Sequence, residues 1–346
     1  MYNGENKIHK EIRVRRIGVV TAGRDAPGMN AIIRSVARTA FDHNYEVIGF
    51  RNGFDGLMQN DAFVMNKSDV SGILHLGGTI LGTSTGNPFT FETAIQQVKK
   101  NIQELSITNL VIIGAFKYMQ RAAILSEAGI PLLGIPASID NNIPCTDFSV
   151  GFLTAADFVA SSLDRLHDTA NAHHRIFLVE VMGGGAGWIG IIGGLTGGAD
   201  LILVPEQVFT VEGVIHHIEN RKSSGKNFSI IVISDEVQIP ADLKKKVEAS
   251  PNQYFLDILM NELRVKGNLE IRKLVLGHLQ RGGSPNVADR LLATLMGHFA
   301  VENIRNGVTG KMITYSKGAL DTVNITAIQQ PKEVTSEMIA LAKIFY

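Results

Sequence analysis

The sequence predicts an α/β protein built from doubly wound parallel sheets. Two observations carry this prediction: short apolar runs rich in Val and Ile recur along the chain, and segments with helical periodicity lie between them. A short, continuous apolar run is typical of a strand that is buried on both faces, as in a parallel sheet. Strands that alternate with helices form βαβ units, which favour an open, doubly wound sheet.

The expected strands fall into two sets, one in each half of the chain. The apolar runs lie at residues 17–20, 47–50, 110–113, 132–135, 176–181, 201–204 and 230–233. After the first run, Ile33, Val36, Ala37 and Ala40 follow the spacing of one helix face, which predicts a helix over 30–42. The 346 residues suffice for about two domains of roughly 150 residues each.

Composition and charge exclude several classes of protein. The chain is 45% hydrophobic and 19% charged, so it can bury a large core. Lys plus Arg and Asp plus Glu number 33 each, which argues against a broad basic face for nucleic acid or anionic lipid. The single cysteine, Cys145, cannot form an intrachain disulfide or a multi-cysteine zinc site. We see no apolar stretch of the ~20 residues of a membrane span and no secretory signal, and therefore expect a cytoplasmic protein without membrane or nucleic-acid partners.

The loop that follows the first expected strand reads TAGRDAPGMN over residues 21–30. Glycines at a strand-to-helix turn free backbone N–H groups to face a phosphate, and the helix N-terminus adds a favourable partial charge. The dinucleotide pattern G-x-G-x-x-G and the Lys-Ser/Thr ending of a P-loop are both absent from this loop. By itself the loop therefore does not identify a nucleotide-binding family.

Four further loops give the chain a family resemblance. They are GGTILGT at 77–83, PASIDNN at 136–142, HHRIFLVEVMGG at 173–184 and GHLQRGGSP at 277–285. In this order and spacing, from about Arg16 to the C-terminus, the chain resembles the phosphofructokinase family of the bacterial 6-phosphofructokinase type. The resemblance implies two doubly wound, Rossmann-like lobes in the phosphofructokinase fold. A donor-side lobe would comprise residues 1–151 plus about 280–330, and a sugar-phosphate lobe 152–279 plus about 331–346.

Members of this family transfer a phosphoryl group from ATP or pyrophosphate to fructose 6-phosphate, use Mg²⁺ and usually form tetramers. The resemblance assigns the sugar phosphate to Arg175, Arg272, His278 and Arg281. Such converging cations hold a phosphate dianion in a fixed orientation through charge-assisted hydrogen bonds. In the family the first two arginines reach across a subunit boundary, so their presence implies an oligomeric site.

The resemblance also assigns the residues that contact the sugar itself. Met182 and Gly183 match residues that line the sugar. Asp235 falls where the family usually has a glutamate that holds a sugar hydroxyl, although Glu236 lies next to it and leaves the register open. The sugar-phosphate half of the site is therefore expected to be retained.

The loops that match the phosphoryl-donor half are altered. The family has Gly-Gly-Asp where this chain reads Gly23-Arg24-Asp25, so a side chain stands where the backbone should approach the nucleotide phosphates. The second glycine-rich loop supplies a Mg²⁺ carboxylate in the family. Here it begins at Gly114, has no aspartate, and places Phe116 and Lys117 in that region. A cation replaces part of the charge of Mg²⁺ but cannot bridge phosphate oxygens in the same geometry.

The catalytic loop is altered as well. Asp140 matches the carboxylate that removes the proton from the 1-hydroxyl of the sugar, whereas Asn142 stands where the family has an aspartate, and an amide lacks its negative charge. The family's arginine is missing from the stretch 83–89, and its second arginine is Gly184 here. An arginine on a transferring phosphoryl group contributes roughly 10³–10⁵ in rate. We therefore expect a chain that binds fructose 6-phosphate and is catalytically impaired.

Three hypotheses about function stay open. The first is a regulatory or structural subunit of glycolysis, in a homo-tetramer or in a hetero-oligomer with an active phosphofructokinase. The second is an active 6-phosphofructokinase in which Arg24 and Lys117 serve an unusual donor site. The third is a stand-alone sugar-phosphate sensor. We expect no resident metal, and Mg²⁺ with ATP or pyrophosphate is needed only by an active enzyme.

A second anion site is suggested on the first expected helix. Arg34 and Arg38 match positions that contribute to an effector-phosphate pocket between subunits in bacterial family members. Because they are four residues apart, they lie on one helix face. The alternative is a solvated cationic face.

Overall fold

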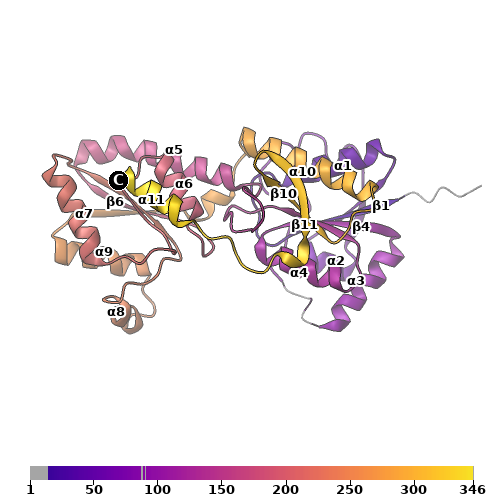
Figure 1. Cartoon of the computed structure of the whole chain (residues 1–346), viewed down its shortest axis with the longest axis horizontal. Helices are drawn as coiled ribbons and strands as arrows, with labels where there is room; N and C mark the ends of the chain where they lie inside the picture. The colour runs from indigo at the N-terminus through magenta and orange to yellow at the C-terminus, as the bar shows by residue number, and fades with distance from the viewer. Residues whose placement is uncertain (1–14, 87–88, 90, 346) are drawn as a thin grey trace, which may run out of the picture.

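The computed structural model describes residues 15–86, 89 and 91–345, and shows two α/β lobes side by side along the long axis of the molecule (Figure 1). Each lobe is built on one sheet. The larger sheet has seven strands in the order β11-β10-β5-β4-β1-β2-β3, and the smaller has four in the order β7-β8-β6-β9. Strand pairing is parallel throughout, except that β3 and β11 run antiparallel to their neighbours. The predicted α/β, doubly wound class is therefore confirmed.

The strands of the larger sheet are β1 (Arg16–Ala22), β2 (Glu46–Phe50), β3 (Ala62–Met65), β4 (Ile107–Gly114), β5 (Leu132–Pro136), β10 (Lys311–Ser316) and β11 (Ala319–Asn324). Those of the smaller sheet are β6 (Ile176–Val181), β7 (Leu201–Leu203), β8 (Ser229–Ser234) and β9 (Ile271–Val275). Each predicted apolar run falls on one of these strands, and the run expected to end at Val204 ends one residue earlier.

Helices cover both faces of each sheet. They are α1 (Met29–Asp42), α2 (Gly53–Gln59), α3 (Glu92–Glu104), α4 (Phe116–Glu127), α5 (Phe152–His173), α6 (Trp188–Thr196), α7 (Val211–Ser223), α8 (Lys244–Ala249), α9 (Phe255–Gly267), α10 (Val287–Arg305) and α11 (Ser336–Ile344). Successive strand residues point to opposite faces of a sheet. Val19 accordingly packs in the cluster that contains α1 and α10, whereas Val20 packs in the cluster that contains α2, α3 and α4.

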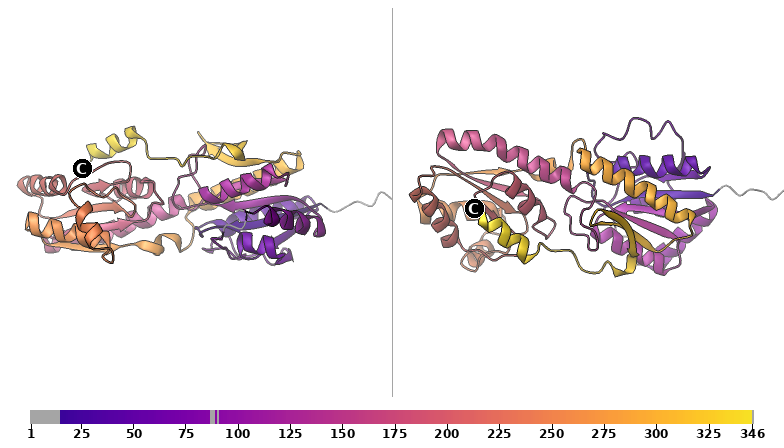
Figure 2. Two further views of the ribbon diagram at one scale, coloured as in Figure 1. Left: turned by 90° about the horizontal axis from the view of Figure 1, so that it is seen from below. Right: turned by 45° about the horizontal axis from the view of Figure 1, so that its top comes forward.

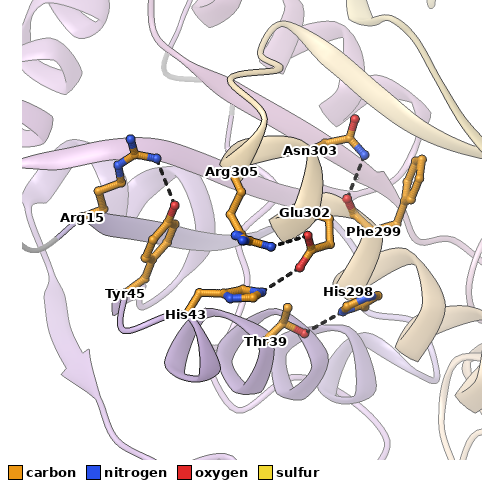
Figure 3. A network of polar contacts seen from close by, with 9 residues as sticks. All are labelled: Arg15, Thr39, His43, Tyr45, His298, Phe299, Glu302, Asn303 and Arg305. Atoms are coloured by element: carbon orange, nitrogen blue, oxygen red, sulfur yellow. Dashed lines mark hydrogen bonds and ion pairs between the residues drawn. The ribbon is translucent and has the colours of Figure 1, made fainter.

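The chain crosses between the lobes more than once. After β9 it returns to the first lobe, where α10 packs along α1 and β10 and β11 extend the larger sheet. His43, the residue after α1, and Arg305 on α10 both contact Glu302, at 2.7 Å and 2.6 Å (Figure 3). The chain then crosses again, and both views of Figure 2 place α11 beside the second lobe. The lobe boundaries at 151, about 280 and about 330 stay a prediction.

Two sets of polar contacts, one of them fully buried, fix these crossings. Asp289 at the start of α10 is fully buried and accepts hydrogen bonds from Gly151 N at 2.8 Å and Thr154 N at 2.7 Å, at the start of α5. In the last crossing, Lys332 Nζ donates to the carbonyl oxygens of Thr146 at 2.8 Å and Asp147 at 2.9 Å. The backbone of the C-terminal crossing is therefore tied to the first lobe beside the loop that follows β5.

Among the described residues, no helix combines the length and the apolarity that crossing a bilayer requires.

Candidate functional site

Two adjoining cavities lie between the lobes. The larger, of about 740 Å³, is bordered by loops that follow β1, β6 and β8 and by the short 3₁₀ helix at Gly277–Arg281. The smaller, of about 460 Å³, is bordered mainly by the loops that follow β4 and β5 and by the start of α4. Arg24, Thr85, Glu236 and Arg281 border both. Ligands of open α/β sheets bind beyond the carboxyl ends of the strands, so these cavities are the candidate site.

The larger cavity contains most of the residues predicted to contact the sugar phosphate. Met182, Asp235, His278 and Arg281 border it. Gly183 follows Met182 in the turn after β6, where Ala186 N donates to the Gly183 carbonyl oxygen at 3.2 Å. The structure therefore brings side chains from three separate loops of the second lobe to one wall.

Arg175 and Arg272 are not among the residues that border either cavity. Arg272 lies on the edge strand β9, and Arg175 directly precedes the neighbouring strand β6. Arg272 Nη2 donates to Glu270 Oε1 at 2.9 Å, and Arg175 Nε lies 3.6 Å from the same oxygen. The Arg272 side chain is 49% exposed and the Arg175 side chain is 34% exposed. Within one chain, these two arginines therefore do not join the cavity that holds Arg281.

The acidic residues of the larger cavity influence one another. Asp235 reaches solvent through the cavity, but desolvation by the surrounding wall, together with the charges of Glu236, Glu180 and Asp140, raises its pKa to about 6. Glu180 is buried on β6, and burial raises the pKa of its carboxyl group, while the Tyr254 hydroxyl donates a hydrogen bond to it. Asp235 thus changes charge close to neutral pH.

The first loop is held tightly against α4. Gly23 has a φ of +97°, and a Cβ atom there would lie 2.1 Å from the Tyr118 ring, so only glycine fits. Thr83 Oγ1 donates to the Gly23 carbonyl oxygen at 2.5 Å, and Gly23 N donates to Ser84 O at 3.0 Å. The next residue, Arg24, is exposed and borders both cavities.

Cations gather at the start of α4 in the smaller cavity. Of the residues assigned to the second glycine-rich loop, Phe116 and Lys117 border it, whereas Gly114 ends β4 and does not. Arg121 also borders it, donates to Gly86 O at 2.8 Å and stacks over the Tyr118 ring at 4.5 Å. Arg121 was missed by the sequence analysis, although its position four residues after Lys117 puts both on one helix face.

The catalytic-loop residues meet the second lobe in this smaller cavity. Asp140 is 9% exposed, and its Oδ1 lies 3.9 Å from Arg281 Nη2. Burial raises the pKa of Asp140, while the charges of Arg281 and Arg24 act in the opposite direction. Asn142 Nδ2 donates to the carbonyl oxygen of Gly184 at 3.2 Å, across the lobe boundary.

The backbone of Gly184 packs closely against the side chain of Asp140. It has a φ of +58°, and a Cβ atom there would lie 2.5 Å from Asp140 Oδ2. An arginine at this position, as in the family pattern, would therefore require the loop or Asp140 to move. The side-chain amide of Asn142 donates to the carbonyl oxygen of Gly184, and the absence of a side chain at Gly184 leaves room for Asp140. Both features therefore belong to one contact between the lobes.

Several polar atoms of this region have no hydrogen-bond partner among the described residues. They are Asp140 Oδ1, Asn142 Oδ1, and Nε and Nη2 of Arg281, all of them buried. Buried donors and acceptors are normally paired, and each unpaired one costs about 1–3 kcal/mol. This pattern is expected of a site that a polar ligand or water completes.

The residues present do not fit the Mg²⁺ that the family resemblance implies. The described part of the chain contains no group of three or more His, Cys, Asp or Glu side chains that could hold a metal ion. Around the start of α4, Lys117 and Arg121 are cations, whereas Mg²⁺ is bound by oxygen ligands. The carboxylate of Asp140 lies 3.9 Å from Arg281 Nη2, so its negative charge is already partly offset by a cation.

The proposed effector residues lie elsewhere. Arg38 on α1 is exposed and borders a separate cavity of about 240 Å³ together with Phe41, Asp42 and Lys67. Arg34 on the same helix is half-buried and does not border that cavity. Their effector role stays a prediction.

The fold and the site define an α/β protein with a polar site between two lobes. Residues 16–304 match the model of the phosphofructokinase family, and the chain belongs to that family. It is 36% identical over 340 residues to a pyrophosphate–fructose 6-phosphate 1-phosphotransferase of Dictyoglomus thermophilum, covering 96% of this chain and 98% of that protein. It is 38% identical over 333 residues to an ATP-dependent 6-phosphofructokinase of Halothermothrix orenii, covering 96% and 99%.

A solved structure supports the fold. The pyrophosphate-dependent phosphofructokinase of Nitrosospira multiformis superposes with a TM-score of 0.83, covering 93% of this chain and 86% of that chain at 18% identity. At this identity the likeness concerns the fold alone. The predicted family and the predicted phosphofructokinase fold are therefore both confirmed.

Proposed function

We propose that this protein binds fructose 6-phosphate in the larger cavity and is impaired in phosphoryl transfer. It then acts in glycolysis as a cytoplasmic regulatory or structural subunit, in a homo-tetramer or in a hetero-oligomer with an active phosphofructokinase. The observation that carries the proposal is the asymmetry between the two cavities. Met182, Asp235 and His278 border only the larger one, together with the shared Arg281, whereas the cations Lys117 and Arg121 border only the smaller one, where a metal-loaded donor would need carboxylates.

The oligomeric part of the proposal is supported by the two outlying arginines. Arg175 and Arg272 match sugar-phosphate residues but both contact Glu270 beside the edge strand β9, away from the cavity of their own chain. A neighbouring subunit that presents this edge to the cavity would add two guanidinium groups to Arg281 and His278. The phosphate of fructose 6-phosphate would then be held by cations from two chains.

The impairment is supported by the missing groups around Asp140. The family resemblance gives this carboxylate the proton of the sugar 1-hydroxyl, but no arginine stands at residue 184, and residues 83–89 contain none. Charge that develops on a transferring phosphoryl group would be stabilised by cations such as Arg24, Lys117, Arg121 and Arg281, without a bridging metal. Since a single such stabiliser contributes roughly 10²–10³ in rate, we expect turnover at least about 10³-fold below that of an active relative.

Two measurements on the purified protein test the proposal. Calorimetry should show saturable binding of fructose 6-phosphate, and a coupled assay should show little fructose 1,6-bisphosphate with Mg²⁺ and either ATP or pyrophosphate. Turnover at roughly 1–100 s⁻¹, the ordinary range for kinases, would contradict the impairment and favour the active-enzyme hypothesis. Co-purification of an active phosphofructokinase from the native source would distinguish a subunit from a stand-alone sensor.

A further inference from the structure

The smaller cavity carries uncompensated positive charge. Arg24, Lys117, Arg121 and Arg281 border it, against Asp140 and Glu236. The charge of Asp140 is offset by Arg281, which lies 3.9 Å away. In the described part of the chain, Arg24 and Lys117 have no hydrogen-bond or ion-pair partner, and both are exposed toward solvent. Such cations attract an anion into the cavity.

Helix α4 adds backbone donors to this cavity. It begins at Phe116, and its N-cap residue, Ala115, provides no side-chain cap. Tyr118 N donates to Ala115 O at 2.9 Å, and the backbone N–H groups of Phe116 and Lys117, which precede it, have no partner within the helix. Ala115 and Phe116 both border the cavity. The partial positive charge of a helix N-terminus favours phosphate groups.

A buried arginine points to a ligand at the same place. Arg281 is only 5% exposed and borders the cavity, yet its Nε and Nη2 atoms have no hydrogen-bond partner among the described residues. A guanidinium group has five N–H donors in a planar fork that matches phosphate oxygens. Asp140 Oδ1 and Asn142 Oδ1 are unpaired acceptors nearby, which leaves a position for a hydroxyl or water donor beside the anion.

We propose that the smaller cavity binds a polyanion of the pyrophosphate class without a metal ion. This inference rests on the proposed function, because it assigns a ligand to a cavity that has lost its transfer chemistry. Arg24 lies in the loop after β1, Arg281 on the 3₁₀ helix, and Lys117 and Arg121 on α4, so cations from three separate elements border one cavity and can hold two linked phosphate groups. The cations thus take the place that Mg²⁺ would hold in a donor site, and the ligand acts as an effector.

Calorimetry with inorganic pyrophosphate, in EDTA and then in excess Mg²⁺, tests this proposal. We expect saturable binding in EDTA that Mg²⁺ does not strengthen, because Mg²⁺ neutralises the charge that the arginines and Lys117 recognise. Arg24→Gly and Lys117→Met should each weaken binding about 10- to 100-fold, the range for a lost charge-assisted hydrogen bond. The matched control is Lys100→Met on α3, a side chain that is 66% exposed and lies outside both cavities, and its affinity should be unchanged.

Three results would overturn the proposal: binding only when Mg²⁺ is added, no binding in either condition, or equal affinity in wild type and both cavity variants. The last result would place the anion elsewhere, for example at Arg34 and Arg38 on α1. Fructose 6-phosphate is titrated into the same samples. If it binds while pyrophosphate does not, only this inference fails. If pyrophosphate binds while fructose 6-phosphate does not, the proposed function fails and the polyanion site stands.

Discussion

The two cavities differ in charge although they share a wall. The larger is bordered by four carboxylate side chains, Asp25, Asp55, Asp235 and Glu236, and by the cationic or titratable Arg24, Arg281 and His278. The smaller has the opposite balance, with four cationic side chains against Asp140 and Glu236. In an isolated chain, a phosphate group therefore meets more positive charge in the smaller cavity than in the larger one. The difference suggests that the larger cavity needs cations from a second subunit, whereas the smaller one is complete within one chain.

The largest expected effect comes from Arg281, the buried cation common to both cavities. Arg281→Ala should weaken both fructose 6-phosphate and pyrophosphate by about 100-fold or more, because the lost guanidinium group would contact either anion. It also leaves Asp140 buried without its nearest cation, which costs about 1–3 kcal/mol of stability. Calorimetry with each ligand and urea unfolding measure these effects.

The control for this variant uses an arginine outside the cavities. Arg272→Ala should weaken fructose 6-phosphate and leave pyrophosphate unchanged, since Arg272 lies at the β9 edge with Glu270. Equal losses for both ligands in Arg272→Ala would show that the two cavities do not differ in their need for a second subunit. Unchanged affinities in Arg281→Ala would remove it from both sites.

The interlobe contact at Gly184 predicts the next largest effect. Gly184→Ala should lower the free energy of unfolding by about 2–4 kcal/mol, since a Cβ atom would combine a left-handed backbone with a 2.5 Å approach to Asp140 Oδ2. Gly72 is the matched control: it has a φ of +73° and nothing within 4 Å of the added Cβ atom, so Gly72→Ala should cost only about 1–2 kcal/mol. Comparing the urea unfolding of both variants isolates the steric contribution to the loss of unfolding free energy. Equal losses of free energy would show that Gly184 does not pack tightly on Asp140.

The strands that the sequence predicted are those buried on both faces. The missed strands lie at sheet edges or are half exposed: Val64 on β3 is 52% exposed, and β9 has only Ile271 buried. Residues that face solvent are polar, so no continuous apolar run marks these strands, whereas the edge strand β7 keeps its apolar run and was predicted. The predicted helix over 30–42 is confirmed, and α1 begins one residue earlier, at Met29.

For the site, the sequence predicted residue types but not their pairing. Asp140 and Asn142 were expected in the catalytic loop, and Lys117 and Gly184 in the donor site; all four border the smaller cavity. In the sequence, Asn142 and Gly184 are two separate departures from the family pattern. Their hydrogen bond joins residues that are 42 positions apart and in different lobes, and no local pattern indicates such a contact.

That contact can be tested from the side of Asn142. Asn142→Asp should cost about 1–2 kcal/mol of unfolding free energy at pH 7, because a carboxylate cannot donate to Gly184 O and would lie near Asp140. The loss should shrink as pH falls, since the protonated carboxyl group can donate again. Asn142→Ala removes the same hydrogen bond without adding charge, so its loss should not depend on pH. Parallel curves for the two variants would contradict this account.

The smallest expected effect concerns the pH dependence of sugar binding. The pKa of Asp235 is raised to about 6 by partial desolvation and by the carboxylates around it, so the residue is charged at pH 7.5 and largely neutral at pH 5. A charged carboxylate accepts a hydrogen bond from a sugar hydroxyl more strongly than a neutral one does. Affinity for fructose 6-phosphate should therefore fall as the pH drops through 6, and the part due to Asp235 should be about three- to tenfold.

The sugar phosphate also titrates near pH 6, so the wild-type profile alone does not isolate Asp235. Asp235→Asn keeps the size of the side chain and removes its titration, while the ligand titrates as before. The ratio of the two affinities, measured by calorimetry from pH 5 to pH 8, should change with a midpoint near 6 and be largest at high pH. A constant ratio would mean that Asp235 does not contact the sugar, and would move the hydroxyl contact to the neighbouring Glu236, which borders the same cavity.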